Sequence, residues 1–414
     1  MEQFIVDQIT YGLKYVPGNL AKSFFIRKSN EETKKLRKNF ILGVCHPNED
    51  YKKIKDANIG WIRIDIPFPF DKDGAESESY KSFKARCKGY ADNGVKVMAV
   101  TPYPSSYIES GLDPRSAENE ERIKEIARFF TQDLKGLVGA FQVTNEMGIP
   151  RFILPLNMDE AVRFIAIQLE AMYPVRGDML IGYNSAGPQA DLHTKLRDYH
   201  KYCDYIGVDL YMGCFYGAPG FMWLFDAVIR YLWALTGKPI LLQEFGYIGA
   251  GAPKTKAEKK AILGKYGAKS EKDAKKNIEK FVENMPDHFK EHVKFLANND
   301  PSRFTELIFN SDLTNHLYCE LPKTTKIPGY DHTPEGQAKF YADILPRLYK
   351  LPYVCGCIIY CWQDSDKCYV CGQAECPTET VWGLTDRYGE PKPSYYAVQK
   401  AMGHIRWEQN CENK

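Results

Sequence analysis

The fold is read most directly from two stretches of the chain, Gln142-Val143-Thr144-Asn145-Glu146 and Ile240-Leu241-Leu242-Gln243-Glu244-Phe245-Gly246. Each starts as an apolar run with strand character and ends in a single glutamate that is followed by turn-prone residues. A glutamate at the exit of a buried strand is costly unless its charge is paired or used. We therefore treat Glu146 and Glu244 as the first candidates for a functional site.

Similar β-branched, apolar runs recur along the chain and alternate with amphipathic helical patterns. We predict strands at 40–44, 61–66, 95–100, 139–143, 179–183, 205–210, 239–243 and 354–360. Helical patterns lie between them, for example at 80–93, 118–134, 158–172 and 333–348. Such alternation argues for parallel strands, and eight of them close a (β/α)8 TIM barrel, so the predicted fold class is α/β.

A doubly wound open sheet is the alternative to the barrel. Such a sheet usually carries a glycine-rich phosphate loop after its first strand. The corresponding residues here are Gly43-Val44-Cys45-His46-Pro47, which do not form that pattern. The barrel is therefore the preferred fold.

The spacing between the seventh and eighth strands is unusually long. Roughly a hundred residues separate them, whereas a plain barrel connection needs only a few tens. The segment 252–297 is rich in lysine and glutamate and has helical periodicity, which indicates a solvated helical face. We predict a helical insertion at 251–330 inside a barrel of residues 39–405, with an N-terminal extension at 1–38 and a tail at 406–414.

Composition excludes several classes of partner. The 414 residues carry a net charge of only +2, so no overall field favours nucleic acid or an anionic membrane. We find no window of 18 uninterrupted apolar residues, which excludes a predicted transmembrane helix. The first twenty residues lack the apolar core of a signal peptide, and this predicts a cytoplasmic protein. Nothing in the sequence indicates an oligomeric state.

Two glutamates on different strands suit a reaction that needs one carboxylic acid and one carboxylate. Cleavage of a glycosidic bond is such a reaction. In a (β/α)8 barrel the catalytic residues sit at the C-terminal ends of the strands. Glu146 ends the predicted fourth strand and Glu244 ends the predicted seventh, so both occupy the expected face.

This arrangement resembles the clan A retaining glycoside hydrolases, which are (β/α)8 barrels with Asn-Glu after strand four and Glu after strand seven. The resemblance runs from about residue 40 to residue 402. It includes Trp61-Ile62-Arg63 on strand two, the strand-six segment 204–211 that ends in Tyr211, and Tyr360-Cys361-Trp362 after strand eight. Each motif is short, but their order and spacing together are specific. The implied substrate is a carbohydrate.

The resemblance implies a role for each of these residues. Glu244 would be the nucleophile and Glu146 the acid/base, with their carboxyl groups about 5 Å apart. Asn145 would bond the 2-hydroxyl of the sugar. Arg63 and Tyr211 would keep Glu244 charged and oriented.

Three further residues are expected to contact the sugar. Trp362 would form an apolar platform under the sugar ring. His46, just after strand one, is expected to reach the substrate, and a loop histidine with partners in the protein is the alternative. Asp209 occupies the place near the strand-six tyrosine where some members of the clan carry a histidine, so it is also placed in the substrate site.

Two other functions compete with the glycosidase. The first is a barrel that binds carbohydrate without catalysis, although such a barrel has no need of both carboxylates. The second is a metal-dependent hydrolase or a phosphate-binding lyase. That enzyme would show histidine clusters or a glycine-rich phosphate loop after strands seven and eight. The stretch Gly246-Tyr247-Ile248-Gly249-Ala250-Gly251 is rich in glycine, but it directly follows Glu244, and we interpret it as the start of the insertion.

A group of cysteines follows strand eight. Cys368-x-x-Cys371 together with Cys376 has the spacing of metal ligands, and a fourth ligand would complete a tetrahedral zinc site. A structural zinc, a disulfide and free thiols are three alternatives for this group. A zinc ion would hold the loop beside Trp362 in place. The retaining mechanism itself requires no cofactor.

Overall fold

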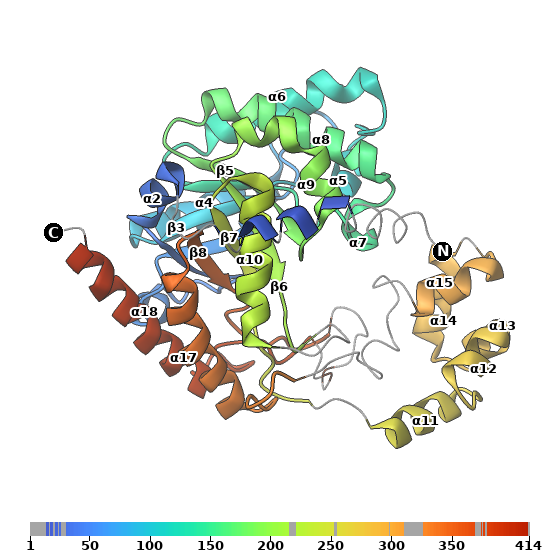
Figure 1. Ribbon diagram of the computed structural model, residues 1–414. Helices are drawn as coiled ribbons and strands as arrows, with labels where there is room; N and C mark the ends of the chain where they lie inside the picture. The colour runs from blue at the N-terminus through green and yellow to red at the C-terminus, as the bar shows by residue number, and fades with distance from the viewer. Residues whose placement is uncertain are drawn as a thin grey trace.

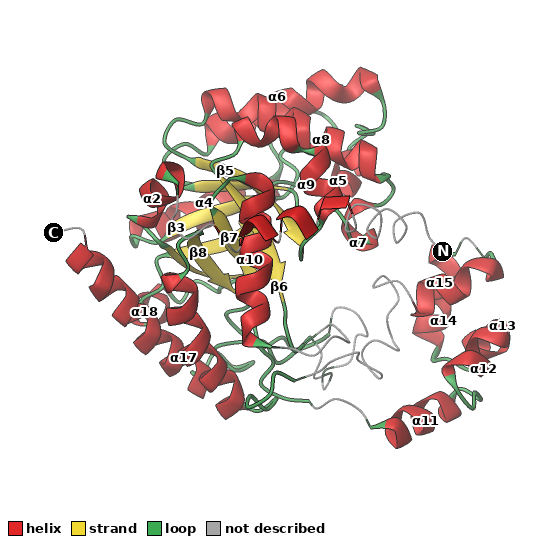
Figure 2. Ribbon diagram, in the orientation of Figure 1, coloured by secondary structure: helices red, strands yellow, loops and turns green. Residues whose placement is uncertain are grey.

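The computed structural model describes residues 30–214, 221–251, 255–297, 299–309, 326–368 and 379–412, with single residues and short pieces between 14 and 25 and at 374 and 376. Its centre is a closed barrel of eight parallel strands that pair in sequence order from β1 to β8. Figure 2 shows these strands in yellow with the helices outside them. The predicted (β/α)8 fold is confirmed.

The strands are short and almost entirely buried. They are β1 (Ile41–Cys45), β2 (Trp61–Asp65), β3 (Lys96–Val100), β4 (Ala140–Val143), β5 (Leu180–Ala186), β6 (Tyr205–Leu210), β7 (Ile240–Phe245) and β8 (Val354–Ile359). All eight coincide with a predicted strand. The largest difference is in β5, which continues three residues beyond its predicted end at Tyr183.

The helices that surround the barrel, and those of the connections, are α2 (Glu31–Arg37), α3 (Tyr51–Asp56), α4 (Glu78–Asp92), α5 (Pro104–Glu109), α6 (Glu120–Asp133), α7 (Pro150–Ile153), α8 (Met158–Met172), α9 (Ala190–Lys195), α10 (Met222–Thr236), α17 (Pro334–Lys350) and α18 (Pro393–Glu412). Short 3-10 helices are η1 (Ala117–Asn119), η2 (Tyr173–Val175), η3 (Arg197–Tyr202) and η4 (Pro301–Arg303). Within the described ranges, no helix combines the length and the apolar character needed to cross a membrane.

Local sequence explains where α8 starts. Asn157 caps the helix by accepting hydrogen bonds from the backbone N–H groups of Asp159 and Glu160. The Glu160 side chain in turn accepts from the backbone N–H of Asn157, which completes a capping box. The helix begins at Met158 and ends at Met172, as predicted. The prediction holds because the capping residues and the apolar periodicity both place the first turn at Met158.

Helices α11 (Lys256–Lys265), α12 (Glu271–Lys276), α13 (Ile278–Glu283), α14 (Asp287–Leu296) and α15 (Phe304–Phe309) lie between β7 and β8 in the chain. In Figure 1 they stand to one side of the barrel. They enclose a hydrophobic cluster of their own, which includes Ile262, Phe281, Val282, Val293 and Ile308. Residues 252–254 and 310–325, which connect them to the barrel, lie outside the described residues, so the bounds of the insertion stay a prediction.

Helix α2 packs on the barrel near the start of β8, and helix α18 is the last helix that the structure describes. The Arg37 guanidinium at the end of α2 donates to the carbonyls of Leu351 and Val354, each at 2.7 Å. These carbonyls lie at the start of β8, so α2 is tied to the N-terminal end of the barrel. Helix α18 runs on to Glu412. Residues 406–412, which we predicted to be a tail, therefore continue the last helix.

A buried chain of hydrogen bonds joins β5 to α9 and η3. The Ser185 hydroxyl donates to the carbonyl of Gly187 at 2.8 Å, so its oxygen accepts from His193 Nε2 at 2.9 Å. His193 Nδ1 then accepts from the Tyr183 hydroxyl at 2.9 Å, and this oxygen accepts from His200 Nε2 at 3.0 Å. Burial lowers the pKa of His193 to about 3 and that of His200 to about 4. Both imidazoles are therefore neutral in the folded protein.

The upper layer of the barrel interior is polar. The side chains of Arg63, Gln142, Asn184 and Gln243 are at most 1% exposed, and they come from four different strands. Space for them depends on Gly207 in β6, where a Cβ would lie 1.6 Å from Oε1 of Gln243. Buried polar groups must find partners inside the protein. This layer forms the floor of the site described next.

Candidate active site

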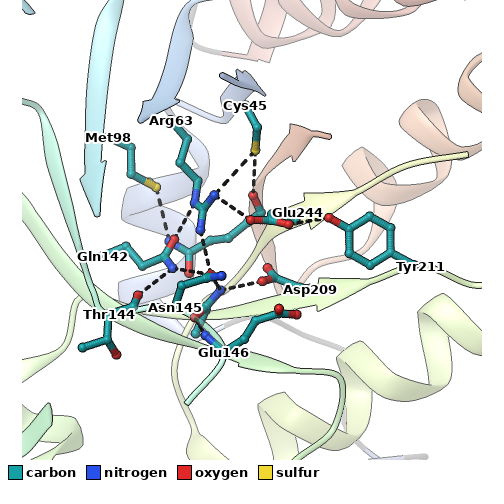
Figure 3. Close-up of polar contacts among 12 residues, drawn as sticks. Cys45, Arg63, Met98, Gln142, Thr144, Asn145, Glu146, Asp209, Tyr211 and Glu244 are labelled. Atoms are coloured by element: carbon teal, nitrogen blue, oxygen red, sulfur yellow. Dashed lines mark hydrogen bonds and ion pairs between the residues drawn. The ribbon is translucent and has the colours of Figure 1, made fainter. Parts of the chain in front are cut away.

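The two candidate glutamates lie at the C-terminal ends of their strands. Glu146 comes three residues after the end of β4, and Glu244 is the penultimate residue of β7. Both are buried, with 9% of Glu146 and 7% of Glu244 exposed. Figure 3 shows their carboxyl groups with that of Asp209 on the same side of one hydrogen-bond network.

A register shift directs Glu244 into the barrel. Across β6 and β7, Val208 pairs with Leu242 and Asp209 pairs with Glu244, so Gln243 is an extra residue of β7. Consecutive residues of a regular strand point to opposite faces. Here both Gln243 and Glu244 make contacts inside the barrel, because the irregularity changes the direction of one of them.

Both carboxylate oxygens of Glu244 accept a strong hydrogen bond. Arg63 Nη1 lies 2.6 Å from Oε1, and Arg63 is only 1% exposed. The Tyr211 hydroxyl donates to Oε2. Hydrogen bonds and an opposite charge favour the ionised form of a carboxylate and fix its orientation. Arg63 and Tyr211, which we expected beside Glu244, thus both contact its carboxylate, while their roles stay a prediction.

The charges around Arg63 and Tyr211 keep both groups protonated. Burial lowers the pKa of Arg63, but the negative groups around it, with Glu244 first among them, bring that pKa well above its ordinary value. Burial, followed by the Glu244 carboxylate, raises the pKa of Tyr211 well above its ordinary range. Each side chain thus remains a hydrogen-bond donor to Glu244.

The amide of Asn145 has a defined orientation. Its Oδ1 accepts from Arg63 Nη2 at 2.7 Å, from Gln142 Nε2 at 2.9 Å and from Asn184 Nδ2 at 2.7 Å. Three donors can face only the oxygen of an amide, so the NH2 group points the other way. No hydrogen bond from this NH2 group is found among the described residues. It is available to a ligand.

Three residues at this end of the barrel have positive φ angles without being glycine. They are His46 at 48°, Thr144 at 58° and Glu146 at 44°. Residues held in this region cost free energy and persist only where their surroundings fix them. The Thr101 hydroxyl accepts from the backbone N–H of Thr144 at 3.0 Å, and Asn184 Oδ1 accepts from that of Glu146 at 2.9 Å. These bonds hold the turn that presents Glu146.

Asp209 does not lie where the sequence placed it. We expected it to contact substrate, but it is 0% exposed, and its Oδ2 accepts from Asn184 Nδ2 at 2.6 Å. Burial, then the nearby charges of Glu244 and Glu146, raises the pKa of Asp209 well above its ordinary value. Asp209 is therefore buried beneath the site, and it is not a surface that a sugar can touch.

Trp362 also differs from its predicted role. Its side chain is 1% exposed, and its indole N–H donates to Oδ1 of Asn48 at 2.9 Å. The ring packs edge-on against Tyr395 of α18, with centroids 6.1 Å apart. This packing against an outer helix leaves no free face for a sugar ring, so the expectation of a platform at Trp362 is corrected.

Tyr360 lies beside Tyr211, the residue that donates to the predicted nucleophile Glu244. Its ring centroid is 5.9 Å from that of Tyr211 and 6.1 Å from that of His46, which is exposed. Tyr360 was not among the predicted sugar contacts, which included the larger ring of Trp362 two residues further on. Its position directly after β8 was the available signal.

Three more residues of the site were missed. Gln142 stands inside the stretch that defines the motif, and it accepts from Arg63 Nε at 2.6 Å. Asn184 lies one residue beyond the predicted end of the fifth strand, and its place at that strand end was the available signal. Tyr103 follows β3; its pKa is raised by burial first and then by the negative charges of Asp65, Glu244 and Glu146. Tyr103 therefore keeps its proton near both glutamates.

The proposed zinc ligands are only partly described. Cys368 and Cys376 are buried, whereas Cys371 lies outside the described residues. Among the residues that are described, no group of three or more histidine, cysteine, aspartate or glutamate side chains is arranged to hold a metal ion. The structural zinc stays a prediction.

The chain was compared with known protein families, with curated proteins and with solved structures. No family model and no curated protein match the sequence. Among solved structures, a family 39 glycoside hydrolase from Bacteroides cellulosilyticus WH2 has a TM-score of 0.52 at 14% identity and covers 91% of this chain. The Ignisphaera aggregans GH53 catalytic domain has a TM-score of 0.53 at 17% identity and covers 88%. A Bacteroides uniformis β-glucuronidase has a TM-score of 0.51 at 12% identity and covers 88%.

The lengths of these proteins differ from that of this chain. The alignment spans 96% of the GH53 domain, 65% of the family 39 protein and 35% of the β-glucuronidase. At these identities the likeness establishes a common architecture. The fold that this chain shares with these three proteins is the (β/α)8 barrel.

Proposed function

We propose that this protein is a retaining glycoside hydrolase that cleaves a β-glycosidic bond of an oligo- or polysaccharide. The observation that carries the proposal is the pair of donors on Glu244, Arg63 at one oxygen and Tyr211 at the other. A nucleophilic carboxylate must be aimed at the carbon that it attacks, and these two bonds fix the direction of the Glu244 carboxylate. The fold shared with glycoside hydrolases supports the same conclusion.

In the first step Glu244 attacks the anomeric carbon and forms an ester with the sugar. The bond between that carbon and the leaving oxygen breaks, and Glu146 gives its proton to that oxygen. Negative charge leaves Glu244 as the ester forms. Arg63 remains beside it and stabilises the charge again when the ester is hydrolysed.

In the second step water attacks the same carbon from the side that the leaving group vacated. Glu146, now a carboxylate, takes a proton from this water and thus regains its starting form. The ester bond to Glu244 breaks and the carboxylate is restored. Two inversions give a product with the original anomeric configuration.

Asn145 contributes through the sugar's 2-hydroxyl. Its oxygen is occupied by three donors, so its NH2 group is the part that faces a ligand. A hydrogen bond to the 2-hydroxyl strengthens as the transition state forms. The amide therefore favours the transition state over the bound substrate.

The test is hydrolysis of a panel of aryl β-glycosides by the wild type, Glu244→Ala and Glu146→Ala. The panel holds the glucoside, galactoside, mannoside, xyloside and glucuronide. We expect one sugar to be cleaved by the wild type, and Glu244→Ala to be inactive until azide is added, which then gives a glycosyl azide of inverted configuration. Glu78→Ala, which removes a glutamate that is 85% exposed, is the control and should match the wild type.

Other outcomes decide against the proposal. Full activity of Glu244→Ala on a cleaved sugar would show that this residue is not the nucleophile. If the wild type hydrolyses neither the panel nor polysaccharides but binds sugars in calorimetry, the protein is a carbohydrate-binding barrel without catalysis.

A further inference from the structure

Asn184 lies at the centre of the polar floor, and every polar atom of its side chain is used. Its Nδ2 donates to Asn145 Oδ1 at 2.7 Å and to Asp209 Oδ2 at 2.6 Å. Its Oδ1 accepts from the backbone N–H of Glu146 at 2.9 Å. Because a backbone N–H can only donate, the oxygen and nitrogen of this amide cannot be exchanged.

Asp209 completes this arrangement as the second acceptor for the NH2 group of Asn184. It is 0% exposed, and Glu244 and Glu146 lie near it together with Arg63, Tyr211 and Cys45. An ionised Asp209 would place a third negative charge beside the two glutamates. Burial and those glutamates raise the pKa of Asp209, which favours the neutral form of the carboxyl group that accepts from Asn184.

We propose that Asn184 and Asp209 are positioning residues that together fix the amide of Asn145 and the main chain of Glu146. The kinetic part of this inference rests on the proposed glycosidase function. Asp209 accepts a hydrogen bond from the NH2 group of Asn184 and so fixes the orientation of that amide. The oriented Asn184 amide in turn bonds to Asn145 and to the backbone N–H of Glu146, both of which follow β4. The Asn145 NH2 group is thereby presented to the sugar, and Glu146 is kept at its φ of 44°.

Packing around Asn184 shows that the barrel is built to accept it at this point. A Cβ on Gly207, its register partner on β6, would lie 2.8 Å from the Cβ of Asn184. Real Cβ atoms do not approach so closely, so a side chain at position 207 would displace Asn184. The site of Asn184 thus depends on a glycine in the adjacent strand.

The decisive variant is Asn184→Asp, which has nearly the same shape. It replaces the NH2 group by an oxygen that faces the acceptors on Asn145 and Asp209, so the Asn145 amide must move. The readout is the ratio of kcat/KM for an aryl glycoside to that for its 2-deoxy analogue. We expect roughly a hundredfold ratio in the wild type. In Asn184→Asp we expect this ratio to fall at least tenfold.

Asp209→Asn is the conservative variant at the second positioning residue, and Ser185→Ala is the matched control. Asp209→Asn keeps a neutral acceptor for Asn184, so it should retain the 2-hydroxyl ratio within about threefold. Ser185→Ala alters the next residue of the same strand, which bonds to His193 and Gly187 instead. It should also retain the ratio, even if it unfolds at a lower temperature. An unchanged ratio in Asn184→Asp would overturn the proposal.

A second readout does not need activity. In protein labelled with 15N-asparagine, the side-chain NH2 signal of Asn145 is identified by its loss in Asn145→Ala. We expect this signal to shift in Asn184→Asp and to stay in place in Ser185→Ala. If Asn184→Asp does not fold, Asn184→Ser replaces it, because the shorter hydroxyl cannot make all three bonds. An unmoved Asn145 signal in a folded variant overturns the inference.

The two readouts separate the two proposals. A wild type that hydrolyses nothing, with a shifted Asn145 signal in the variant, would reject the glycosidase function and leave the positioning role intact. An active wild type whose Asn184→Asp form keeps both the ratio and the signal would reject the positioning role alone.

Discussion

Arg63 Nη1 lies 2.6 Å from Oε1 of Glu244 in the interior of the barrel. The same guanidinium donates through Nε to Gln142 Oε1 at 2.6 Å and through Nη2 to Asn145 Oδ1 at 2.7 Å. One planar side chain on β2 thus joins the proposed nucleophile on β7 to the residues around β4 (Figure 3). Any change at Arg63 acts on both halves of the site.

Arg63→Lys should reduce kcat/KM by at least about tenfold, because a hydrogen bond to a charged group contributes about 1.5–3 kcal/mol and lysine cannot reach three acceptors in one plane. Steady-state kinetics on the cleaved aryl glycoside measures this loss. Wild-type kcat/KM in this variant would contradict the role of the guanidinium fork.

Arg63→Met should lower the free energy of unfolding by about 3–5 kcal/mol, because it leaves the charge of Glu244 buried and unpaired. The matched control is Arg347→Met, which breaks the pair with Asp226 where the arginine side chain is 40% exposed. That change should cost less than about 1 kcal/mol. Urea unfolding of both variants tests the difference, and equal losses would refute it.

Tyr211→Phe should lower the catalytic efficiency, kcat/KM, because it removes a hydrogen bond to the proposed nucleophile. The substitution removes the hydroxyl that donates to Glu244 Oε2 and keeps the ring. We expect kcat/KM to fall by about 10- to 100-fold, in line with a lost hydrogen bond to a charged group. Tyr205→Phe is the control, because that hydroxyl donates to the carbonyl of Phe141 at 2.8 Å. If the two variants lose equal activity, the bond to Glu244 has no special role.

Substitution of Trp362 should lower mainly the stability of the protein, whereas substitution of Tyr360 should weaken mainly the binding of substrate. Trp362→Phe should lower the free energy of unfolding by about 1–3 kcal/mol, since a buried ring is trimmed and the acceptor on Asn48 loses its donor. Its kcat/KM should stay within a few-fold of the wild type. Tyr360→Leu should raise KM by about 2- to 12-fold if its ring contacts the sugar, as a ring contact contributes about 0.5–1.5 kcal/mol. If Trp362→Phe raises KM and Tyr360→Leu does not, then Trp362 is the residue that contacts the sugar ring.

Stability should fall as the solution becomes acidic. The folded-state pKa values of about 3 for His193 and about 4 for His200 lie below the ordinary value of 6.5, so the unfolded chain binds more protons. The stability from these groups is present above pH 6.5 and is lost progressively as the pH falls towards 4. Two protons give a slope of up to about 2.7 kcal/mol per pH unit.

Urea unfolding at pH 7, 6, 5 and 4.5 measures this slope. His200→Gln keeps a donor near Tyr183 but removes one titrating group, so its stability should fall about half as steeply with pH. An identical slope in wild type and variant would show that His200 does not bind the additional proton on unfolding.

Much of the fold followed from local patterns. The predicted β6 and α8 have the same bounds as the observed elements, because apolar periodicity and caps act within a few residues of each other. The predicted site residues Glu146, Glu244, Asn145, Arg63 and Tyr211 are joined by shared hydrogen-bond partners, because parallel strands bring their C-terminal ends to one face. The order of the strands was enough to predict that these five residues lie at the same end of the barrel.

The direction of single side chains did not follow in this way. Asp209 and Trp362 stand beside strand ends, as sugar-binding residues do, yet both are buried in packing. Period-two alternation also fails at Gln243 and Glu244, since the register shift between β6 and β7 turns both inward. A one-residue irregularity of this kind has no signature in the order of apolar and polar residues.

The linear order of residues was sufficient for the eight strands, for the barrel they close and for the two glutamates at its mouth. These depend on periodicity and on which residue ends each strand. Only the closed barrel decided that Asn184 faces Asp209, and that Asn145 receives three donors from three other side chains. A buried polar group has to be satisfied by whatever the fold brings within hydrogen-bond distance. That choice is made by contacts between strands far apart in sequence, so it exists only in the tertiary structure.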